Sequence, residues 1–282
     1  MVKVSAIQMS MSDNKAQNIE KAERLVREAA KNGANIILLP ELFEGLYFCK
    51  DIDDTYFSWA SAREDNALIE HFSTLAKELG VVLPLSYFEK TDTEYFNSLV
   101  VIDSDGVVLE NYRKTHIPDG PGYEEKHYFK PGDTGFKVYK TKFGTIGIGI
   151  CWDQWFSETA RALTLMGAEI IFYPTAIGSE PEIHLDSKEH WQRVQMGHAA
   201  TNTVPVVVAN RYGEEQGATC SLNFYGSSFI TDYTGAKIAE ASRDTEEILY
   251  AEYDLEDHKK QRHYWGLIRD RQPDKYGIIT KK

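Results

Sequence analysis

The hydrophobic and polar positions of the chain follow two patterns, one typical of helices and one typical of strands. Over residues 16–32, apolar side chains recur at a spacing that places them on one helical face, at Ile19, Ala22, Val26 and Ala29. Residues 36–39 are uniformly apolar, as in a strand that is covered on both faces. Applied along the chain, the two patterns predict helices over 16–32 and 66–79 and from about residue 157, and strands over 2–9, 36–39, 81–85, 98–102, 107–112, 136–141 and 145–150.

The connections between these elements differ in length. Asp105 and Gly106 form a strong turn signal between the strands at 98–102 and 107–112, which predicts an antiparallel hairpin. The segment 115–134 is rich in proline, glycine, tyrosine and histidine, and it is interpreted as a loop. Loops of this length inside a compact domain are usually functional, so we expect this one to contribute to a site.

The second half of the chain repeats features of the first half. Residues 33–40 resemble residues 167–174, and residues 102–106 resemble residues 231–235. Two related halves predict two similar sheets, each covered by helices on one side, which bury their bare faces against each other. The sequence therefore predicts an α/β fold, a four-layer α-β-β-α sandwich of two pseudo-symmetric sheets. The alternative is that Gly-Ala-x-Ile-Ile is simply a common junction between a helix and a strand.

We expect a single domain over residues 1–282, because no linker or low-complexity segment separates the two halves. From about residue 254 the chain is polar and basic but keeps aromatic and aliphatic anchors, at Tyr264, Trp265, Leu267 and Ile268. This stretch is expected to form an arm that packs on another surface, such as a partner subunit. The expected assembly is a homodimer or a larger homo-oligomer.

Composition and charge narrow the possible partners. Of the 282 residues, 43 are acidic and 31 are basic, which gives a formal net charge of −12. Such a surface repels phosphate backbones, so nucleic acid is a poor partner, whereas a cationic substrate is mildly favoured. No apolar run approaches the ~20 residues that cross a bilayer, and the first residues have the pattern of a strand and not of a signal peptide. Three cysteines that cannot all pair fit a reducing compartment, so we expect a cytoplasmic protein without membrane association.

Cys151 is the strongest candidate for chemistry. It directly follows the predicted strand at 145–150, and groups at the carboxyl ends of strands line the active sites of open α/β folds. Its thiolate is a strong nucleophile wherever nearby charge or a base favours ionisation. The alternative is an inert buried cysteine, which is the commoner role of this residue type. Cys49 and Cys220 are expected to have that inert role.

Two charged residues near strand ends are candidate partners of this thiol. Glu41 comes just after the apolar run at 36–39, where a carboxylate among apolar neighbours suits a general base. Lys114 comes just after the strand at 107–112, and an ammonium beside a reacting carbonyl stabilises a developing oxyanion. Taken alone, Glu41 is better explained as a loop cap and Lys114 as a solvated lysine.

Several classes of site lack their motifs. The histidines have no metal-ligand spacing and no C-x-x-C occurs, so we predict no metal. Neither G-x-G-x-x-G nor a Walker lysine is present, so nucleotide binding has no support and we expect no cofactor. The absence of G-x-S-x-G weakens the case for a serine hydrolase. A papain-like protease would need a histidine base, which no specific placement in the sequence supports.

Taken together, three segments resemble the signature of the nitrilase, or carbon–nitrogen hydrolase, superfamily. The segments are Leu39-Pro40-Glu41-Leu42, Tyr112-Arg113-Lys114-Thr115-His116 and Gly149-Ile150-Cys151-Trp152-Asp153. The resemblance covers nearly the whole chain and implies the four-layer sandwich with a Glu-Lys-Cys triad. Carried over to this sequence, Glu41 is the general base, Lys114 the acid that stabilises the oxyanion, and Cys151 the nucleophile.

Within the superfamily, residues 116–133 and 174–181 are similar to the family of N-carbamoylputrescine amidases. The resemblance implies a small cationic ureido substrate, hydrolysed to an amine, ammonia and carbon dioxide. Glu125 matches an additional glutamate that orients the lysine and the substrate. The positions that the resemblance places near the substrate are Tyr47, Trp152, Thr175, Ala176 and Glu180. Of these, Tyr47 and Glu180 are expected near its amine end.

Other interpretations remain open at this point. An amidase of the same family would act on N-carbamoyl amino acids or aliphatic amides, and a thiolate can also attack a nitrile carbon. A pocket for a substrate with a carboxylate should offer arginine or lysine, whereas the acid at Glu180 favours an amine. A catalytically silent binding protein of this fold would have no need for Glu41, Lys114 and Cys151 together.

Overall fold

The computed structural model describes residues 1–179 and 185–281. Its strands are β1 (Val2–Gln8), β2 (Ile36–Leu38), β3 (Leu83–Lys90), β4 (Tyr95–Ile102), β5 (Val108–Arg113), β6 (Val138–Thr141), β7 (Gly144–Ile148), β8 (Ile170–Pro174), β9 (Val206–Ala209), β10 (Tyr212–Gln216), β11 (Ser221–Tyr225), β12 (Phe229–Thr231), β13 (Lys237–Glu240) and β14 (Glu247–Tyr253). Its α-helices are α1 (Lys15–Lys31), α2 (Ala67–Leu79), α3 (Glu125–Tyr128), α4 (Ser157–Leu165), α5 (Lys188–Asn202) and α6 (Leu255–Trp265). Short 3-10 helices are formed by Phe48–Lys50, Asp54–Trp59, Cys151–Trp155, Pro273–Lys275 and Gly277–Thr280.

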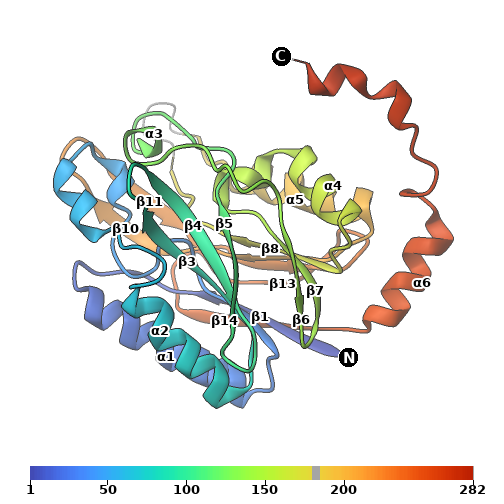
Figure 1. Cartoon of the computed structure of the whole chain (residues 1–282), viewed down its shortest axis with the longest axis horizontal. Coiled ribbons are helices and arrows are strands. Elements are labelled where there is room, and N and C mark those ends of the chain that lie inside the picture. The colour runs from blue at the N-terminus through green and yellow to red at the C-terminus, as the bar shows by residue number, and fades with distance from the viewer. Residues whose placement is uncertain (180–184, 282) are drawn as a thin grey trace.

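Two large sheets form the centre of the molecule (Figure 1). In one sheet the strand order is β6-β7-β8-β9-β12-β13. In the other, β14-β1-β2 and β3-β4-β5 are joined by a parallel bridge between Ile36 and Val82. Each sheet thus has one antiparallel edge strand, then three parallel strands, then two antiparallel strands. The matching order and directions confirm the predicted pseudo-symmetry.

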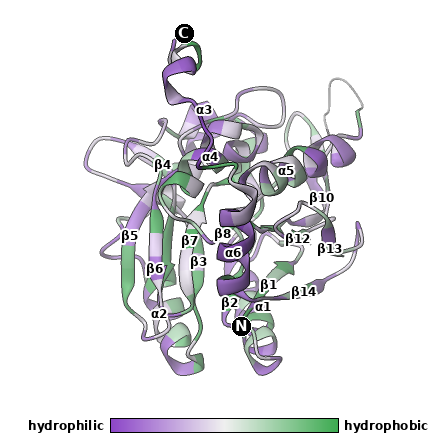
Figure 2. Ribbon diagram, turned by 90° about the vertical axis from the view of Figure 1, so that its right-hand side faces the viewer, coloured by the Kyte–Doolittle hydropathy of each residue, from purple (hydrophilic) through white to green (hydrophobic). Residues whose placement is uncertain are grey.

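Each sheet carries two long helices on its outer face. Helices α1 and α2 pack on the sheet that contains β1, and α4 and α5 pack on the sheet that contains β7, which gives the predicted α-β-β-α layers (Figures 1 and 2). Helix α2 begins where the Asn66 side chain accepts the N–H of Ile69, and it ends at Gly80 in the left-handed conformation. Among the described residues, none of the helices has both the length and the apolar character needed to span a bilayer.

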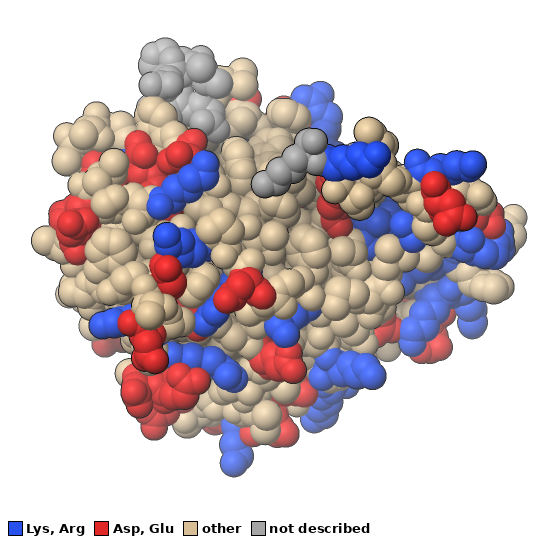
Figure 3. Space-filling model, turned by 45° about the horizontal axis from the view of Figure 1, so that its top comes forward, with Lys and Arg blue, Asp and Glu red and all other residues tan. Residues whose placement is uncertain are grey.

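The C-terminal segment first runs along the sandwich as helix α6, where Arg262 donates to the carbonyls of Ala168 and Thr203, and then extends away from it (Figure 1). Helix α6 begins after its N-cap Asp254, the position from which the arm was expected, and short 3-10 helices follow it. Lys and Arg side chains gather on this segment, at the right of Figure 3. Several of its large apolar side chains are exposed, namely Tyr264, Trp265, Leu267, Ile278 and Ile279.

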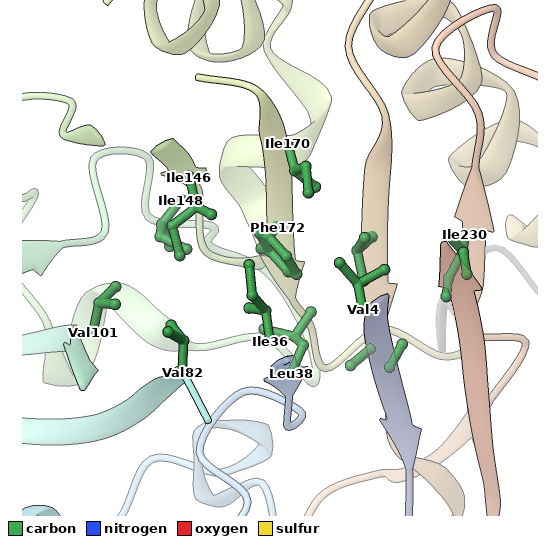
Figure 4. Close-up of a cluster of buried hydrophobic side chains, with 14 of the residues drawn as sticks. Val4, Ile36, Leu38, Val82, Val101, Ile146, Ile148, Ile170, Phe172 and Ile230 are labelled. Atoms are coloured by element: carbon green, nitrogen blue, oxygen red, sulfur yellow. The ribbon is translucent and has the colours of Figure 1, made fainter. Parts of the chain in front are cut away.

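The space between the sheets is filled by one apolar core. In β2, Ile36 and Leu38 face this core, while Ile37 packs beneath α1 and α2. In β8, Ile170 and Ile171 divide in the same way between the central core and the helices α4 and α5. Figure 4 shows side chains of both sheets meeting in this core. The solid apolar runs therefore arise because both faces of these strands are buried.

The structure corrects two predictions for the first half. The strand expected over 81–85 begins at Leu83 and continues to Lys90, because it pairs with β4 along its whole length. The segment 115–134, interpreted as a loop, contains the one-turn helix α3. Both differences arise from contacts between segments, which local sequence patterns do not report.

Candidate active site

Four reactive side chains from separate segments come together in one buried cluster. Glu41 follows β2, Lys114 follows β5, Glu125 begins α3 and Cys151 follows β7. Cys151 is 5% exposed, and the other three side chains are completely buried. Three of the four thus lie just beyond a strand, where active-site groups of α/β folds are commonly found. The structure brings together the residues that the three sequence segments singled out.

The ammonium of Lys114 is at the centre of the cluster. Its Nζ donates to Oε1 of Glu41 over 2.9 Å and to Oε1 and Oε2 of Glu125 over 2.8 and 2.7 Å. Burial opposes the charge of Lys114, but the two carboxylates outweigh it and hold the pKa of the lysine well above its ordinary value. Lys114 is therefore a permanent cation that is shielded from water.

Glu41 presents two different carboxylate oxygens. Its Oε1 accepts from Lys114 and from Nδ2 of Asn97, the latter over 2.7 Å. Its Oε2 is buried and has no hydrogen-bond partner among the described residues. The next residue, Leu42, has a φ of +47°, a strained conformation that is held where the buried guanidinium of Arg211 donates to the carbonyls of Glu41 and Leu42. The geometry leaves one fixed, unpaired oxygen able to take a proton.

A tight turn carries Cys151 away from β7. The φ of Cys151 is +42°, a conformation that is unfavourable for a residue other than glycine. The carboxylate of Asp153 stabilises the turn, since its Oδ2 accepts the N–H of Ile150 over 2.9 Å and the hydroxyl of Tyr112 over 2.7 Å. Because Tyr112 lies two residues before Lys114, Asp153 also ties the cysteine turn to the segment of the lysine.

Burial largely decides the resting charges of the remaining groups. It raises the pKa of the Cys151 thiol well above its usual value, and Glu41 adds to this rise while Lys114 opposes it. Burial also raises the pKa of Glu125 to about 7, with Lys114 opposing the rise and Glu41 adding to it. At rest Cys151 is thus a neutral thiol, so its attack on a substrate requires a base.

Two predicted substrate-binding residues contact the carboxylates of the cluster. The side chain of Tyr47 is fully buried, and its hydroxyl donates to Oε1 of Glu125 over 2.7 Å. This bond links Tyr47 to the lysine end of the cluster. The carbonyl of Thr175 accepts the backbone N–H of Glu41 over 3.4 Å. Thr175 thus borders the base through its main chain, while its hydroxyl is bonded elsewhere.

The other predicted positions surround the thiol. The Sγ atom of Cys151 lies 3.7 Å from the carbonyl oxygen of Ala176. Trp152 follows in the 3-10 helix, with 37% of its surface exposed, and the first N–H groups of a helix have no partner within it. The backbone N–H of Trp152 therefore lies in the first turn of this helix, directly after the thiol in the sequence. Glu180 lies outside the described residues, so its expected contact with a substrate amine stays a prediction.

Three residues around the cluster were not candidates from the sequence. They are Asn97, which binds Glu41, Asp153, which holds the cysteine turn, and Arg211, which holds the turn after Glu41. Asp153 left a signal, because a carboxylate two residues after a nucleophile at a strand end is well placed to accept backbone N–H groups. The role of Asn97 depends on the pairing of β4 with β5, which brings it beside Lys114, and the role of Arg211 depends on how the two sheets pack.

The carboxylates of the cluster are engaged by the lysine. Among residues 1–179 and 185–281, no group of three or more His, Cys, Asp or Glu side chains is placed to hold a metal ion. The two carboxylates next to Cys151 are both bound to Lys114.

Fold and site together define the class of this protein. It is an α/β enzyme, a four-layer sandwich that gathers a thiol, a lysine and two carboxylates in one buried cluster. A family model described as carbon-nitrogen hydrolase matches residues 3–263, and the chain belongs to this family. The predicted resemblance to the nitrilase superfamily is thereby confirmed.

Proteins of known name are similar over almost the whole chain. An N-carbamoylputrescine amidase of Oryza sativa subsp. japonica is 53% identical, with 99% of this chain and 94% of that protein covered. A citrullinase of Francisella tularensis is 51% identical, with 100% of this chain and 99% of that protein covered. The crystal structure of a carbon-nitrogen hydrolase from Helicobacter pylori G27 has a TM-score of 0.94 and 38% identity, covering 100% of this chain and 99% of that chain.

Proposed function

We propose that the chain is a thiol amidohydrolase that converts N-carbamoylputrescine to putrescine, ammonia and carbon dioxide, a step that forms a polyamine. The observation that carries this proposal is the buried cluster in which Glu41 and Glu125 share Lys114 next to Cys151. It supplies a base, a cation and a nucleophile at one point. The 53% identity to an N-carbamoylputrescine amidase supports the choice of substrate.

The first step joins the sulfur to the substrate. Oε2 of Glu41, the oxygen without a partner, takes the proton of the Cys151 thiol as the sulfur attacks the ureido carbon. The electron pair of the C=O double bond moves to the oxygen, where Lys114 and the backbone N–H of Trp152 stabilise it. Loss of one such donor typically costs about 3–4 kcal/mol in the barrier of an enzyme.

The adduct then collapses by breaking a carbon–nitrogen bond. One nitrogen leaves with the proton that Glu41 returns to it, and a carbamoyl thioester remains on Cys151. A water molecule attacks this thioester while its proton passes to Glu41, and the thiol is released. The carbamate breaks down to carbon dioxide and the second amine. One water is consumed, and putrescine, ammonia and carbon dioxide are formed.

Glu125 keeps the lysine in place during these steps. Glu125 accepts two hydrogen bonds from Lys114, and its Oε1 also accepts a hydrogen bond from the hydroxyl of Tyr47. Lys114 therefore has an anchor besides Glu41, whose charge changes when it takes the proton. In this role Glu125 orients the oxyanion donor.

The far end of the substrate carries an ammonium. We assign its recognition to Glu180, following the resemblance of residues 174–181, with a charge-assisted contact of ~1.5–3 kcal/mol. The net charge of −12 favours the approach of a cation.

Citrulline is the second candidate substrate. A citrullinase is 51% identical over 100% of this chain, and citrulline offers the same ureido group to the thiol. It differs at its far end, where a carboxylate accompanies the amine. A site for that carboxylate would gain most from an arginine or lysine partner, whereas the acid at Glu180 favours the plain amine.

A substrate panel tests the proposal. We expect kcat/KM to be highest for N-carbamoylputrescine, lower for citrulline and lowest for an N-carbamoyl amino acid, with putrescine and ammonia released in equal amounts. Glu180→Gln should raise KM for N-carbamoylputrescine, and a chelator should leave the rate unchanged. Cys151→Ala should be inactive, with Cys220→Ala as the matched active control. A higher kcat/KM for citrulline would overturn the substrate, and turnover by Cys151→Ala would overturn the mechanism.

The proposal extends to assembly. We propose that residues 1–282 act as one domain and that the arm from about residue 254 packs on a second copy of the chain. Residues 255–282 carry eight Lys or Arg and four Asp or Glu, so a basic arm faces an otherwise acidic body. Trp265 and Ile278, which are 60% and 73% exposed, would be covered by the partner. Sedimentation of the full chain should show a dimer or larger species, and Trp265→Asp with Ile278→Asp should shift it toward the monomer. A wild-type monomer at micromolar concentration would refute this assembly.

A reducing, cytoplasmic setting completes the proposal. The reaction requires Cys151 as a thiol, and the cysteines Cys49, Cys151 and Cys220 are all free in the structure. Fractionation of cells that express the tagged chain should recover it with cytosolic enzymes, and recovery with the membrane pellet would contradict this part.

A further inference from the structure

We propose that Asn97 is a positioning residue that makes Oε2 of Glu41 the proton acceptor of the reaction. The inference rests on the proposed function, since it assumes that Glu41 activates Cys151. It adds a residue that neither the sequence segments nor the resemblance assigned to the site.

Asn97 contacts both charged partners of the thiol. It lies on β4 and is fully buried, and its Nδ2 donates to Oε1 of Glu41 over 2.7 Å. Its backbone carbonyl accepts the N–H of Lys114 over 2.9 Å. One residue therefore fixes the carboxylate with its side chain and the lysine with its main chain.

These bonds make the two oxygens of Glu41 unequal. Oε1 accepts one hydrogen bond from the neutral amide of Asn97 and one from the charged ammonium of Lys114. Both bonds stabilise negative charge on that oxygen. Oε2 is buried and has no partner among the described residues. A proton therefore adds to Oε2. The amide of Asn97 also prevents rotation of the carboxylate, which would exchange the two oxygens.

Packing alone does not explain an amide at this position. Oδ1 of Asn97 is buried and has no hydrogen-bond partner among the described residues, a situation that disfavours the folded state. Further along β4, Leu99, Val100 and Val101 are fully buried and apolar. A side chain that served only the core would be expected to match them. The hydrogen bond from Nδ2 to Glu41 offsets the cost of the buried Oδ1 and explains why an amide is present here.

Several titratable or charged groups face Glu41 and must be considered in a test that varies pH. They are Lys114 after β5, Glu125 in α3, Cys151 after β7, Tyr47 and Cys49 in the segment after β2, and Arg211 after β9. A carboxyl introduced at position 97 would lie at hydrogen-bond distance from Glu41, so a new titration in Asn97→Asp belongs to this pair of carboxyls.

The experiment uses two variants and a matched control on the neighbouring strand. Asn97→Ala removes the donor, and Asn97→Asp replaces it with a carboxyl that donates only while it holds a proton. Asn111 on β5 is the control, because its Nδ2 donates to Oε2 of Glu89 over 2.8 Å away from the cluster. For each protein, kcat, KM and the rate of Cys151 labelling by iodoacetamide are measured across pH, with folding checked by circular dichroism.

We expect Asn97→Ala to lower kcat at least tenfold and to change KM less than threefold, since Asn97 acts on the base. In Asn97→Asp, both kcat/KM and the rate of Cys151 labelling should fall as the pH rises. The pH profiles of the wild type and of Asn111→Asp should lack this descending limb. At low pH, where the pair of carboxyls keeps a proton, the activity of Asn97→Asp should approach that of the wild type. Should Asn97→Ala fail to fold, Asn97→Asp carries the test through this pH-dependent rescue.

The inference falls alone if Asn97→Ala keeps kcat within threefold, if Asn97→Asp has the wild-type pH profile, or if Asn111→Asp shows the same new limb. It falls together with the proposed function if wild-type Cys151 is labelled no faster than Cys220 and no ureido substrate is hydrolysed. Because labelling needs no substrate, the two failures are distinguishable.

Discussion

The two halves of the molecule share one arrangement of strands and helices but differ in the side chains at the strand ends. Glu41 and Thr175 occupy equivalent positions, each directly after a proline near the carboxyl end of a parallel strand, and the N–H of Glu41 donates to the carbonyl of Thr175. Cys151 corresponds in register to Met9, because β7 pairs with β8 as β1 pairs with β2. Met9 is an apolar core residue. The repeat thus brings equivalent strand ends together, and single side chains decide which of them carry chemistry.

The halves also divide the groups of the site between them. The chain before β6 supplies the charged side chains Glu41, Lys114 and Glu125, and the chain after β6 supplies Cys151 and Arg211. Arg211 donates to the carbonyl of Glu41, so a residue of one half supports the base of the other. The site is complete only when the two sheets are packed together.

The largest expected effect separates Cys151 from its counterpart Met9. Cys151→Ala should lower kcat by about 10⁴-fold or more and leave the free energy of unfolding close to that of the wild type. Met9→Ala should cost about 2–5 kcal/mol of stability, because it removes a buried side chain, and should keep kcat of the folded protein within about tenfold. Steady-state kinetics and urea denaturation measure the two quantities. Equal losses of kcat in both variants would break the comparison.

A smaller effect separates Glu41 from Thr175. Glu41→Gln keeps the shape of the side chain but removes the base, so kcat should fall by about 10²–10⁴-fold with little change in KM. Thr175→Ser keeps the hydroxyl that donates to Gln154 and should lower kcat less than about tenfold. Single-turnover rates are the measurement. A Thr175→Ser variant as slow as Glu41→Gln would show that the two positions are not distinguished by chemistry.

The smallest effect concerns two carboxylates with opposite pKa shifts. Burial raises the pKa of Glu125 from 4.5 to about 7. Glu240 on β13 is also partly buried, but hydrogen bonds from Lys188 and Lys237 outweigh burial and lower its pKa to about 2. Glu125 therefore contributes stability that is present below pH 4.5 and is lost as the pH rises to about 7. Glu240 contributes stability that is present above pH 4.5 and is lost as the pH falls to about 2.

Urea denaturation of the wild type, Glu125→Gln and Glu240→Gln across pH measures these contributions. Relative to Glu125→Gln, the wild type should lose up to about 1.4 kcal/mol of stability per pH unit between pH 4.5 and 7. Relative to Glu240→Gln, it should gain stability as the pH rises from 2 to 4.5, by less per unit because solvent screens this partly exposed group. Slopes of the same sign for both variants would contradict the account.

Local sequence patterns predicted the sandwich fold better than they predicted which residues surround the Cys151 thiol. The similarity of residues 33–40 and 167–174 predicted the sandwich because both segments must be buried on both faces. Helix α3 was missed because its single turn is held by contacts of Glu125 with distant residues and not by its own periodicity. Asn97 reads as an ordinary polar residue in a strand, and its role emerges only when β4 pairs beside Lys114.

The proposed reaction requires a covalent bond between the substrate carbon and the sulfur of Cys151. The most direct measurement is mass analysis of the peptides of the wild-type protein after rapid acid quenching during turnover of N-carbamoylputrescine. We predict a carbamoyl group on the peptide that contains Cys151, and none on the peptides that contain Cys49 or Cys220. Continued turnover with an unmodified Cys151, or a carbamoyl group on another residue, would contradict the central claim.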